Sequence, residues 1–297
     1  MISESDILES FQHLVENQFQ SDLVLVGSGD DAAVIKKQDK NLIHSLDISK
    51  VNTHFPENSN PEDIAYRSIA VALSDLAAMG AYPSFMTIGL TSDKKDIYWY
   101  KQFTKGVASI IDDYNMKLVG GDITYGELNI CVNVFGYPFK EPLLRSNAKP
   151  NDLVYITGSL GKGRKGLFDW KKNKKSKYIF DYFRPKVNFK KSKYISSLAS
   201  SCIDISDGLI KDLNSICKSS GVGASIKLEK IPIINDINDL SYGDDYELCF
   251  TCEEKYKKDL NQDDYIQIGI ITSGSDVELL NQNENINLNK EGWDSFI

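Results

Sequence analysis

A series of aspartates in this chain lies directly after apolar segments or beside glycines. The first pair, Asp30 and Asp31, follows the apolar run 23–26 in SGDDAAV. The other members of the series are Asp47, Asp75, Asp122, Asp204, Asp207, Asp244 and Asp245. Adjacent like charges repel unless water screens them or a cation binds them. A single such aspartate is more often a turn or N-cap residue, but the repetition favours a Mg²⁺ site, because Mg²⁺ takes carboxylates, water and phosphate as ligands.

Two glycine-containing segments could approach phosphate. The segment IDISDGL, residues 203–209, predicts a helix that begins near Ser206 and Asp207, where free backbone amides would favour an anion. The segment GKGRKG, residues 161–166, matches G-x-G-x-x-G, but the lysine-rich sequence after it is a poor packing helix. No Walker A sequence occurs. If phosphates are bound, another device must bind them.

The elements that would position the aspartates follow from local patterns. Asn60 as N-cap, Pro61 at the first helical position and Gly80 as terminator predict a helix that carries Asp75. Asp75 lies there among small and apolar residues, although an exposed position on the outer face is an alternative. Further strands and helices are predicted in residues 3–19, 22–35, 41–49, 98–115, 116–124, 128–139, 153–157, 202–213 and 242–250.

The element pattern restarts after the proline-bearing stretch 137–152. We therefore expect two α/β domains, residues 1–138 and 139–297, with α+β mixed sheets. Residues 162–193 concentrate lysine and arginine in an otherwise acidic chain. We interpret them as a solvated helix and loop; a nucleic-acid patch and a flap over phosphate are the alternatives.

Composition bounds the protein class. The chain has 297 residues, a formal charge of −8 and five cysteines. The negative charge argues weakly against a general nucleic-acid binder, and the sequence shows no secretory leader or membrane-spanning run, so we expect a cytoplasmic protein. Cys249 and Cys252 form a C-x-x-C in a predicted strand and without a second pair, which indicates packed thiols rather than a zinc site.

Seven motifs, taken in order, closely resemble those of the thiamine-monophosphate kinase family. They are GSGDDAAV, NTHF, ALSDLAAMGAYP, LVGGDIT, LLRSNAKPND, IDISDGL and GDDYELCF. The resemblance implies the two-domain fold of aminoimidazole ribonucleotide synthetase and its relatives. It also implies an N-terminal ATP/Mg²⁺-binding domain that pairs across a homodimer in a barrel-like core, with a C-terminal α/β domain. The expected reaction phosphorylates thiamine monophosphate to thiamine diphosphate with ATP.

The resemblance also assigns roles to individual residues. The positions implied for Mg²⁺ are Asp31, Ser45, Leu46, Asp47, Asp75, Asp122, Asp204 and Asp207; those for ATP are Tyr114, Gly121, Arg145 and Ser206; those for thiamine monophosphate are His54, Asp244 and Trp293. Three positions depart from the family pattern. Leu46 replaces a threonine, so only its carbonyl could be a ligand; Asp244 replaces a longer glutamate; and Gly163 replaces a serine.

The expected chemistry is direct in-line transfer assisted by Mg²⁺, without a catalytic nucleophile from the protein. We expect neither a nucleic acid nor a membrane as partner. One alternative is another ATP-using enzyme of the same superfamily. The other is a non-catalytic module that binds a nucleotide or a nucleic acid.

Overall fold

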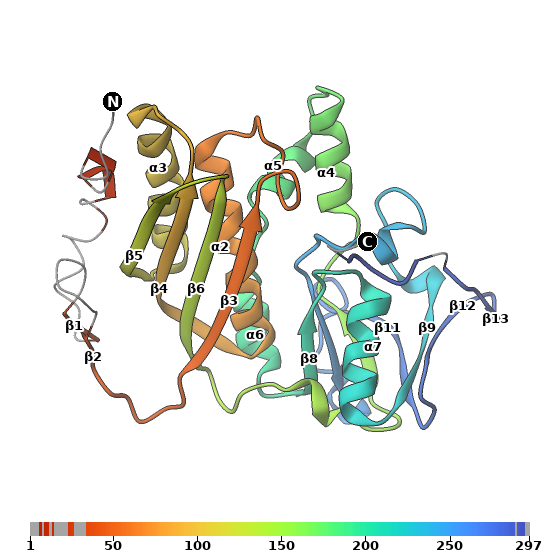
Figure 1. The fold of residues 1–297 in the computed structure, drawn as a ribbon. Helices are drawn as coiled ribbons and strands as arrows, with labels where there is room; N and C mark the ends of the chain where they lie inside the picture. The colour runs from red at the N-terminus through yellow and green to blue at the C-terminus, as the bar shows by residue number, and fades with distance from the viewer. Residues whose placement is uncertain are drawn as a thin grey trace. The chain divides into compact units, whose positions relative to one another are not determined.

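The computed structural model describes residues 6–7, 9–11, 14, 23–26, 34–288 and 290–294. The chain divides into two compact units (Figure 1). The N-terminal unit comprises residues 1–76 and 82–138; the C-terminal unit comprises residues 77–81 and 139–297. Asp30 and Asp31 lie outside the described residues.

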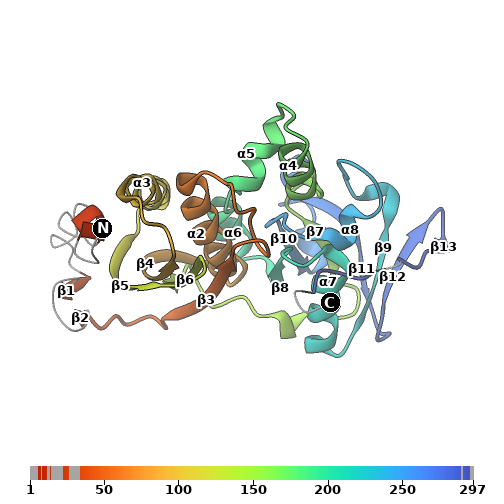
Figure 2. The ribbon, with the colours of Figure 1, turned by 45° about the horizontal axis from the view of Figure 1, so that its top comes forward.

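The N-terminal unit is built on a four-stranded sheet in the order β3-β6-β4-β5. β3 and β6 are antiparallel, whereas β4 and β5 are parallel. Helices α2 and α3 cover one face of this sheet (Figure 2). The elements of the unit are β1 (Val24–Val26), β2 (Val34–Ile35), β3 (Ile43–Lys50), α2 (Pro61–Ala78), β4 (Ala81–Ser92), α3 (Ile97–Tyr114), β5 (Lys117–Tyr125) and β6 (Asn129–Pro138).

The predicted signals at the ends of α2 are confirmed. The side chain of Asn60 accepts a hydrogen bond from the backbone N–H of Glu62 at 3.0 Å, and the helix begins at Pro61. Gly80 follows the helix with φ +66°, a conformation that glycine adopts without strain. Local chemistry therefore fixes the helix that carries Asp75.

The C-terminal unit contains a seven-stranded mixed sheet in the order β13-β12-β9-β11-β7-β10-β8. Helix α7 packs on the apolar face of this sheet through Leu209, Leu213 and Ile216. The elements are η1 (Arg145–Asn147), β7 (Leu153–Ile156), α4 (Lys162–Lys171), α5 (Lys177–Phe183), α6 (Phe189–Ile195), β8 (Ala199–Asp204), α7 (Leu209–Ser220), β9 (Gly223–Lys227), η2 (Leu228–Lys230), α8 (Asp239–Tyr242), β10 (Leu248–Cys252), η3 (Glu254–Tyr256), β11 (Ile266–Thr272), β12 (Val277–Asn281) and β13 (Glu284–Asn285).

Two further sequence expectations have structural outcomes. The lysine-rich stretch 162–193 is more regular than a helix and loop, since α4, α5 and the start of α6 lie in it. Cys249 and Cys252 are buried free thiols of strand β10, as expected. Among the described residues, no helix is both long enough and apolar enough to cross a membrane.

Candidate functional site

Strand β3 and helix α2 bring three of the predicted magnesium residues together in the N-terminal unit. Ser45 and Asp47 are two residues apart on β3, so their side chains leave the same face of the strand. The Ser45 hydroxyl donates a hydrogen bond of 2.5 Å to a carboxylate oxygen of Asp75 on α2. Asp75 is half-buried, which argues against the exposed outer-face alternative.

The chemistry of these residues fits a hard divalent cation. Burial, together with the neighbouring negative charge of Asp75, raises the pKa of Asp47 to about 6. The available ligand atoms are all oxygens, and a cation between the carboxylates would offset the repulsion between Asp47 and Asp75. Among the residues that the structure describes, no group of three or more His, Cys, Asp or Glu side chains is arranged to hold a metal. The two carboxylates and the hydroxyl of Ser45 would leave Mg²⁺ its usual water and phosphate ligands.

Asp122 is not brought to this cluster within one copy of the chain. It lies on β5, and the sheet order places β5 and β3 at opposite edges with two strands between them. At the usual strand spacing the two edges are about 14 Å apart. Gly121 precedes it, and a Cβ there would lie 2.4 Å from the carbonyl oxygen of Ile88, so only glycine fits.

The predicted ligand contacts His54 and Tyr114 are held by neighbours of the same unit. His54 Nδ1 accepts the backbone N–H of Lys50 at 3.0 Å, which leaves the proton of the neutral ring on Nε2. Arg67 donates to the carbonyl oxygen of His54 at 3.2 Å and is itself buried. Tyr114 ends α3 and interacts with the side chain of Tyr66. Both residues are therefore fixed from the chain's own N-terminal unit.

The C-terminal unit gathers most of the remaining predicted residues around the turn from β8 to α7. Asp204 ends β8, and Ser206 and Asp207 form the turn. The backbone N–H of Asp244 donates to the Ser206 carbonyl at 2.8 Å, and that of Trp293 donates to the Asp207 carbonyl at 2.8 Å. Predicted magnesium, nucleotide and substrate residues thus share one small region, although they are up to 89 positions apart (293 − 204).

Arg145 is the exception among the predicted residues of the C-terminal unit. It is exposed on η1, and its carbonyl oxygen accepts a hydrogen bond from Ser220 at the C-terminal end of α7. Ser206 lies before the N-terminal end of α7, and the helix of 12 residues is about 18 Å long. The structure therefore does not bring Arg145 to Ser206 within this unit.

The expected free amides at the start of α7 are also not available to an anion. The Asp212 carboxylate accepts the backbone N–H groups of Asp207 and Gly208 at 3.1 and 3.0 Å. Burial raises the pKa of Asp212 to about 7, and the charge of Asp207 adds to the increase. The prediction of a phosphate-binding helix terminus is wrong for these two amides, because a side chain of the same helix occupies them. An acidic residue in the first turn is the sequence feature that indicates this arrangement.

Sequence reasoning also missed how two acids near Asp244 are used. Oδ1 of Asp245 accepts the backbone N–H groups of Gly161 and Lys162, at 2.7 and 3.1 Å. Glu247 is buried and accepts hydrogen bonds from Thr157, Lys162 and Asn188 at 2.7, 2.8 and 2.9 Å. The segment GKGRKG is thus bound to acids about 84 residues later in the chain.

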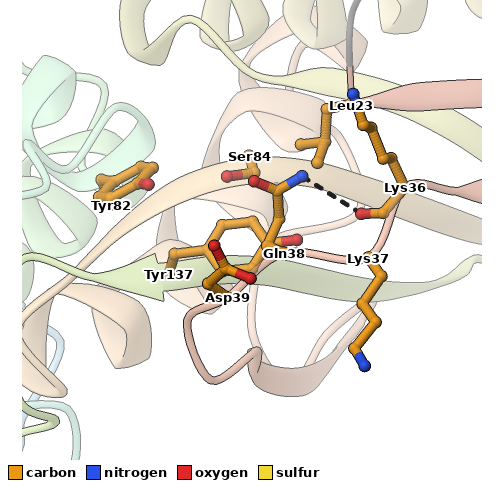
Figure 3. A pocket seen from close by; sticks show the side chains of 8 residues that line it. All are labelled: Leu23, Lys36, Lys37, Gln38, Asp39, Tyr82, Ser84 and Tyr137. Carbon is orange, nitrogen blue, oxygen red and sulfur yellow. Dashed lines mark hydrogen bonds between the residues drawn. The ribbon is translucent and has the colours of Figure 1, made fainter.

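A separate hollow of about 430 Å³ opens near the linker between β2 and β3 (Figure 3). Its walls carry lysine, tyrosine and small polar side chains: Leu23, Lys36, Lys37, Gln38, Asp39, Tyr82, Ser84 and Tyr137. Beside it, the Gln38 side-chain amide donates to the Lys36 carbonyl at 3.3 Å. Figure 3 draws this bond as a dashed line. None of the described residues predicted for the site lines this hollow, so it is distinct from the candidate site.

Comparison with known proteins decides the family. A thiamine-monophosphate kinase of Buchnera aphidicola from Schizaphis graminum is 40% identical over 298 residues, which cover 91% of this chain and 92% of the relative. The chain belongs to the thiamine-monophosphate kinase family. The family member of Escherichia coli K12 is 37% identical over 251 residues, which cover 78% of this chain and 77% of that relative. Residues 29–137 match the model of the AIR synthase related protein, N-terminal domain.

Solved structures of thiamine-monophosphate kinases have the same fold. The enzyme of Stenotrophomonas maltophilia K279a superposes with a TM-score of 0.82 at 28% identity, over 94% of this chain and 96% of that one. AaThiL complexed with AMPPCP and TMP gives a TM-score of 0.78 at 27% identity, over 99% and 98% of the two chains. The expected aminoimidazole ribonucleotide synthetase-like fold of mixed sheets is confirmed.

Proposed function

We propose that this chain transfers the γ-phosphoryl group of ATP to the phosphate of thiamine monophosphate, giving thiamine diphosphate and ADP. Membership of the thiamine-monophosphate kinase family carries this conclusion. A relative of the same fold binds AMPPCP, an ATP analogue, together with TMP. ATP as co-substrate favours the cytoplasm as the location.

The acceptor determines what the protein must do. A phosphate monoester is already ionised near neutral pH, so no strong general base is needed. The protein's task is to hold donor and acceptor in line and to offset their negative charge. Ser206, Tyr114 and Gly121 are proposed for ATP, and His54, Asp244 and Trp293 for thiamine monophosphate. Arg145 is also proposed for ATP on the family resemblance, although its backbone lies at the opposite end of α7 from Ser206.

We assign Mg²⁺ to oxygen ligands in each unit separately. Ser45, Asp47 and Asp75 would hold Mg²⁺ in the N-terminal unit, with the carbonyl oxygen of Leu46 beside them. Asp204 and Asp207 would do so in the C-terminal unit. Bound Mg²⁺ would neutralise charge on the transferring phosphoryl group. Support comes from the hydrogen bond between Ser45 and Asp75 and from the raised pKa of Asp47.

We further propose a homodimer in which the exposed part, on β3, of the sheet face opposite helices α2 and α3 is buried. Leu46 and Ile48 expose 48% and 50% of their surface on the edge strand β3. His44 and Phe135 stack beside them, with ring centroids 4.6 Å apart. A second copy whose sheet meets this one along its edges would close the two sheets into the expected barrel-like core. It would also bring its own β5, with its Asp122, toward the Asp47 cluster of the first. Pairing would thus supply the Asp47 cluster with an Asp122 that a single copy does not bring there.

The proposal is tested by incubating the purified chain with thiamine monophosphate and MgATP and measuring thiamine diphosphate by chromatography. We expect product, and none with EDTA or without ATP.

Asp75→Asn keeps the shape of the side chain but removes its charge, so we expect kcat/KM to fall by roughly 100-fold or more with an unchanged Tm. Asp93→Asn, an exposed carboxylate of the same unit, is the control. Unaltered turnover and magnesium requirement in Asp75→Asn would disprove the ligand assignment.

A further inference from the structure

Asp245 joins two segments that are far apart in sequence. Helix α4 has Gly161 at its N-cap position, and this glycine has no side chain with which to cap the helix. Asp245 supplies the cap instead, through Oδ1, to the N–H groups of Gly161 and Lys162. The other carboxylate oxygen, Oδ2, is buried and has no hydrogen-bond partner within the described residues. The carboxyl group is therefore fixed at the interface between the start of α4 and the loop 243–247.

Glycines make the contact between these segments close. A Cβ at Gly163 would lie 2.1 Å from the carbonyl oxygen of Asp244. Gly161 has φ +93°, and a Cβ there would lie 2.1 Å from a carboxylate oxygen of Asp239. No larger residue fits at either position without displacing its neighbour. The first turn of α4 thus rests directly on the backbone of Asp244.

The loop that receives α4 has an unfavourable backbone conformation. Gly243, Asp244 and Tyr246 have φ values of +78°, +68° and +52°. Residues with a side chain pay a steric cost in this region and need neighbours that impose it. The β8–α7 turn holds one side of the loop, since Asp244 N–H donates to Ser206 and Tyr246 N–H to Ile205. The capped helix α4 holds the other side.

We propose that Asp245 is a positioning residue for thiamine monophosphate, which acts by clamping Asp244 between helix α4 and the β8–α7 turn. The inference rests on the proposed function, in which the Asp244 side chain contacts this substrate. Asp245 itself does not touch the ligand. Removing the Asp245 side chain would free Asp244 to adopt an ordinary backbone conformation. The affinity for thiamine monophosphate would then fall more than the affinity for ATP.

The test compares the dissociation constants of thiamine monophosphate and of AMPPCP by titration calorimetry. We expect Asp245→Ala to weaken thiamine monophosphate binding by roughly tenfold. A change of this size corresponds to the free energy stored in one strained backbone position. The dissociation constant of AMPPCP should change by less than about twofold. Asp245→Asn retains an oxygen acceptor for both N–H groups and should restore binding.

The matched control is Asp96→Ala. Asp96 caps α3 in the N-terminal unit by accepting the N–H of Tyr98 at 2.9 Å, so its removal also costs one helix cap. Its Tm should fall comparably while thiamine monophosphate binding stays unchanged. If Asp245→Ala does not fold, Gly163→Ala, which displaces α4 from the Asp244 carbonyl, should show the same selective loss.

Equal loss of both ligands, or unchanged thiamine monophosphate affinity in a folded Asp245→Ala, would overturn the positioning role alone. Wild-type protein that neither binds nor phosphorylates thiamine monophosphate would overturn the proposed function, and this inference with it.

Discussion

Asp212 is a carboxyl group whose protonation the fold controls. It is buried in the first turn of α7, and its pKa is about 7 instead of the ordinary 3.8 because burial disfavours the charged form. Between these two values the folded chain holds a proton that the unfolded chain has released. Folding stability due to this residue is therefore full below about pH 4 and is lost as the pH rises through 7.

This linkage predicts the behaviour of Asp212→Asn. The variant has no such proton, so its stability relative to wild type should improve with increasing pH, by up to about 1.4 kcal/mol per pH unit between pH 4 and 7. Urea unfolding at several pH values, in EDTA, measures the difference. The exposed Asp263→Asn should instead follow the wild-type curve. Parallel curves for wild type and Asp212→Asn would contradict the raised pKa.

At the level of residues, sequence reasoning found acids whose neighbours in the chain mark them. Asp47 at a strand exit and Asp75 in an apolar helix stand out by their neighbours, whereas Ser45 is implied only by the family resemblance. The partners of Asp245 and Glu247 could not be predicted, because a carboxylate that binds an amide 84 positions earlier leaves no local pattern. Arg145 shows the reverse: its type suits phosphate, yet its element places it at the far end of α7.

At the level of elements, helices α2 and α3 meet through a glycine. A Cβ at Gly106 would lie 2.0 Å from the carbonyl oxygen of Glu62 and 2.9 Å from the Cβ of Ala65. The two backbones therefore approach as closely as they do only because residue 106 has no side chain.

Gly106→Ala should accordingly destabilise the N-terminal unit. Alanine is the better helix former, but the steric overlap would force the helices apart, and we expect a net loss of about 1–3 kcal/mol. Chemical unfolding followed by circular dichroism checks this. Lys105→Ala, an exposed change on the same helix, should leave the unfolding midpoint nearly unchanged. A stabilised Gly106→Ala would show that α2 and α3 adjust freely.

Elements with strong end signals were the most predictable. Asn60, Pro61 and Gly80 mark both ends of α2 within a few residues, and the structure follows them. The lysine-rich stretch was less predictable, because exposed lysines give no apolar periodicity from which α4 and α5 could be delimited.

At the level of the whole molecule, two candidate ligand positions lie on opposite edges of one sheet. β3 carries Asp47, and β5 carries Asp122. Sequence reasoning could place both at strand positions, but only strand order shows that a single copy keeps them apart.

The proposed homodimer predicts the effect of Ile48→Asp. A charge on the exposed face of β3 would have to be desolvated on pairing, so we expect a shift from dimer to monomer and a loss of kinase activity. Light scattering after size-exclusion chromatography measures the mass. Tyr98→Asp, at a side chain 64% exposed on α3, should leave the dimer intact. A dimeric, fully active Ile48→Asp would refute pairing through this face.

The hydrogen bonds from Gly161 and Lys162 to Asp245 also bear on how the protein is made. Contacts between distant positions require a large loop to close and tend to form late in folding. On the ribosome, helix α4 emerges long before the residue that caps it has been translated. We therefore expect a nascent chain to acquire its recognition of thiamine monophosphate only once residue 245 has left the exit tunnel, after most of its strands are already available for pairing.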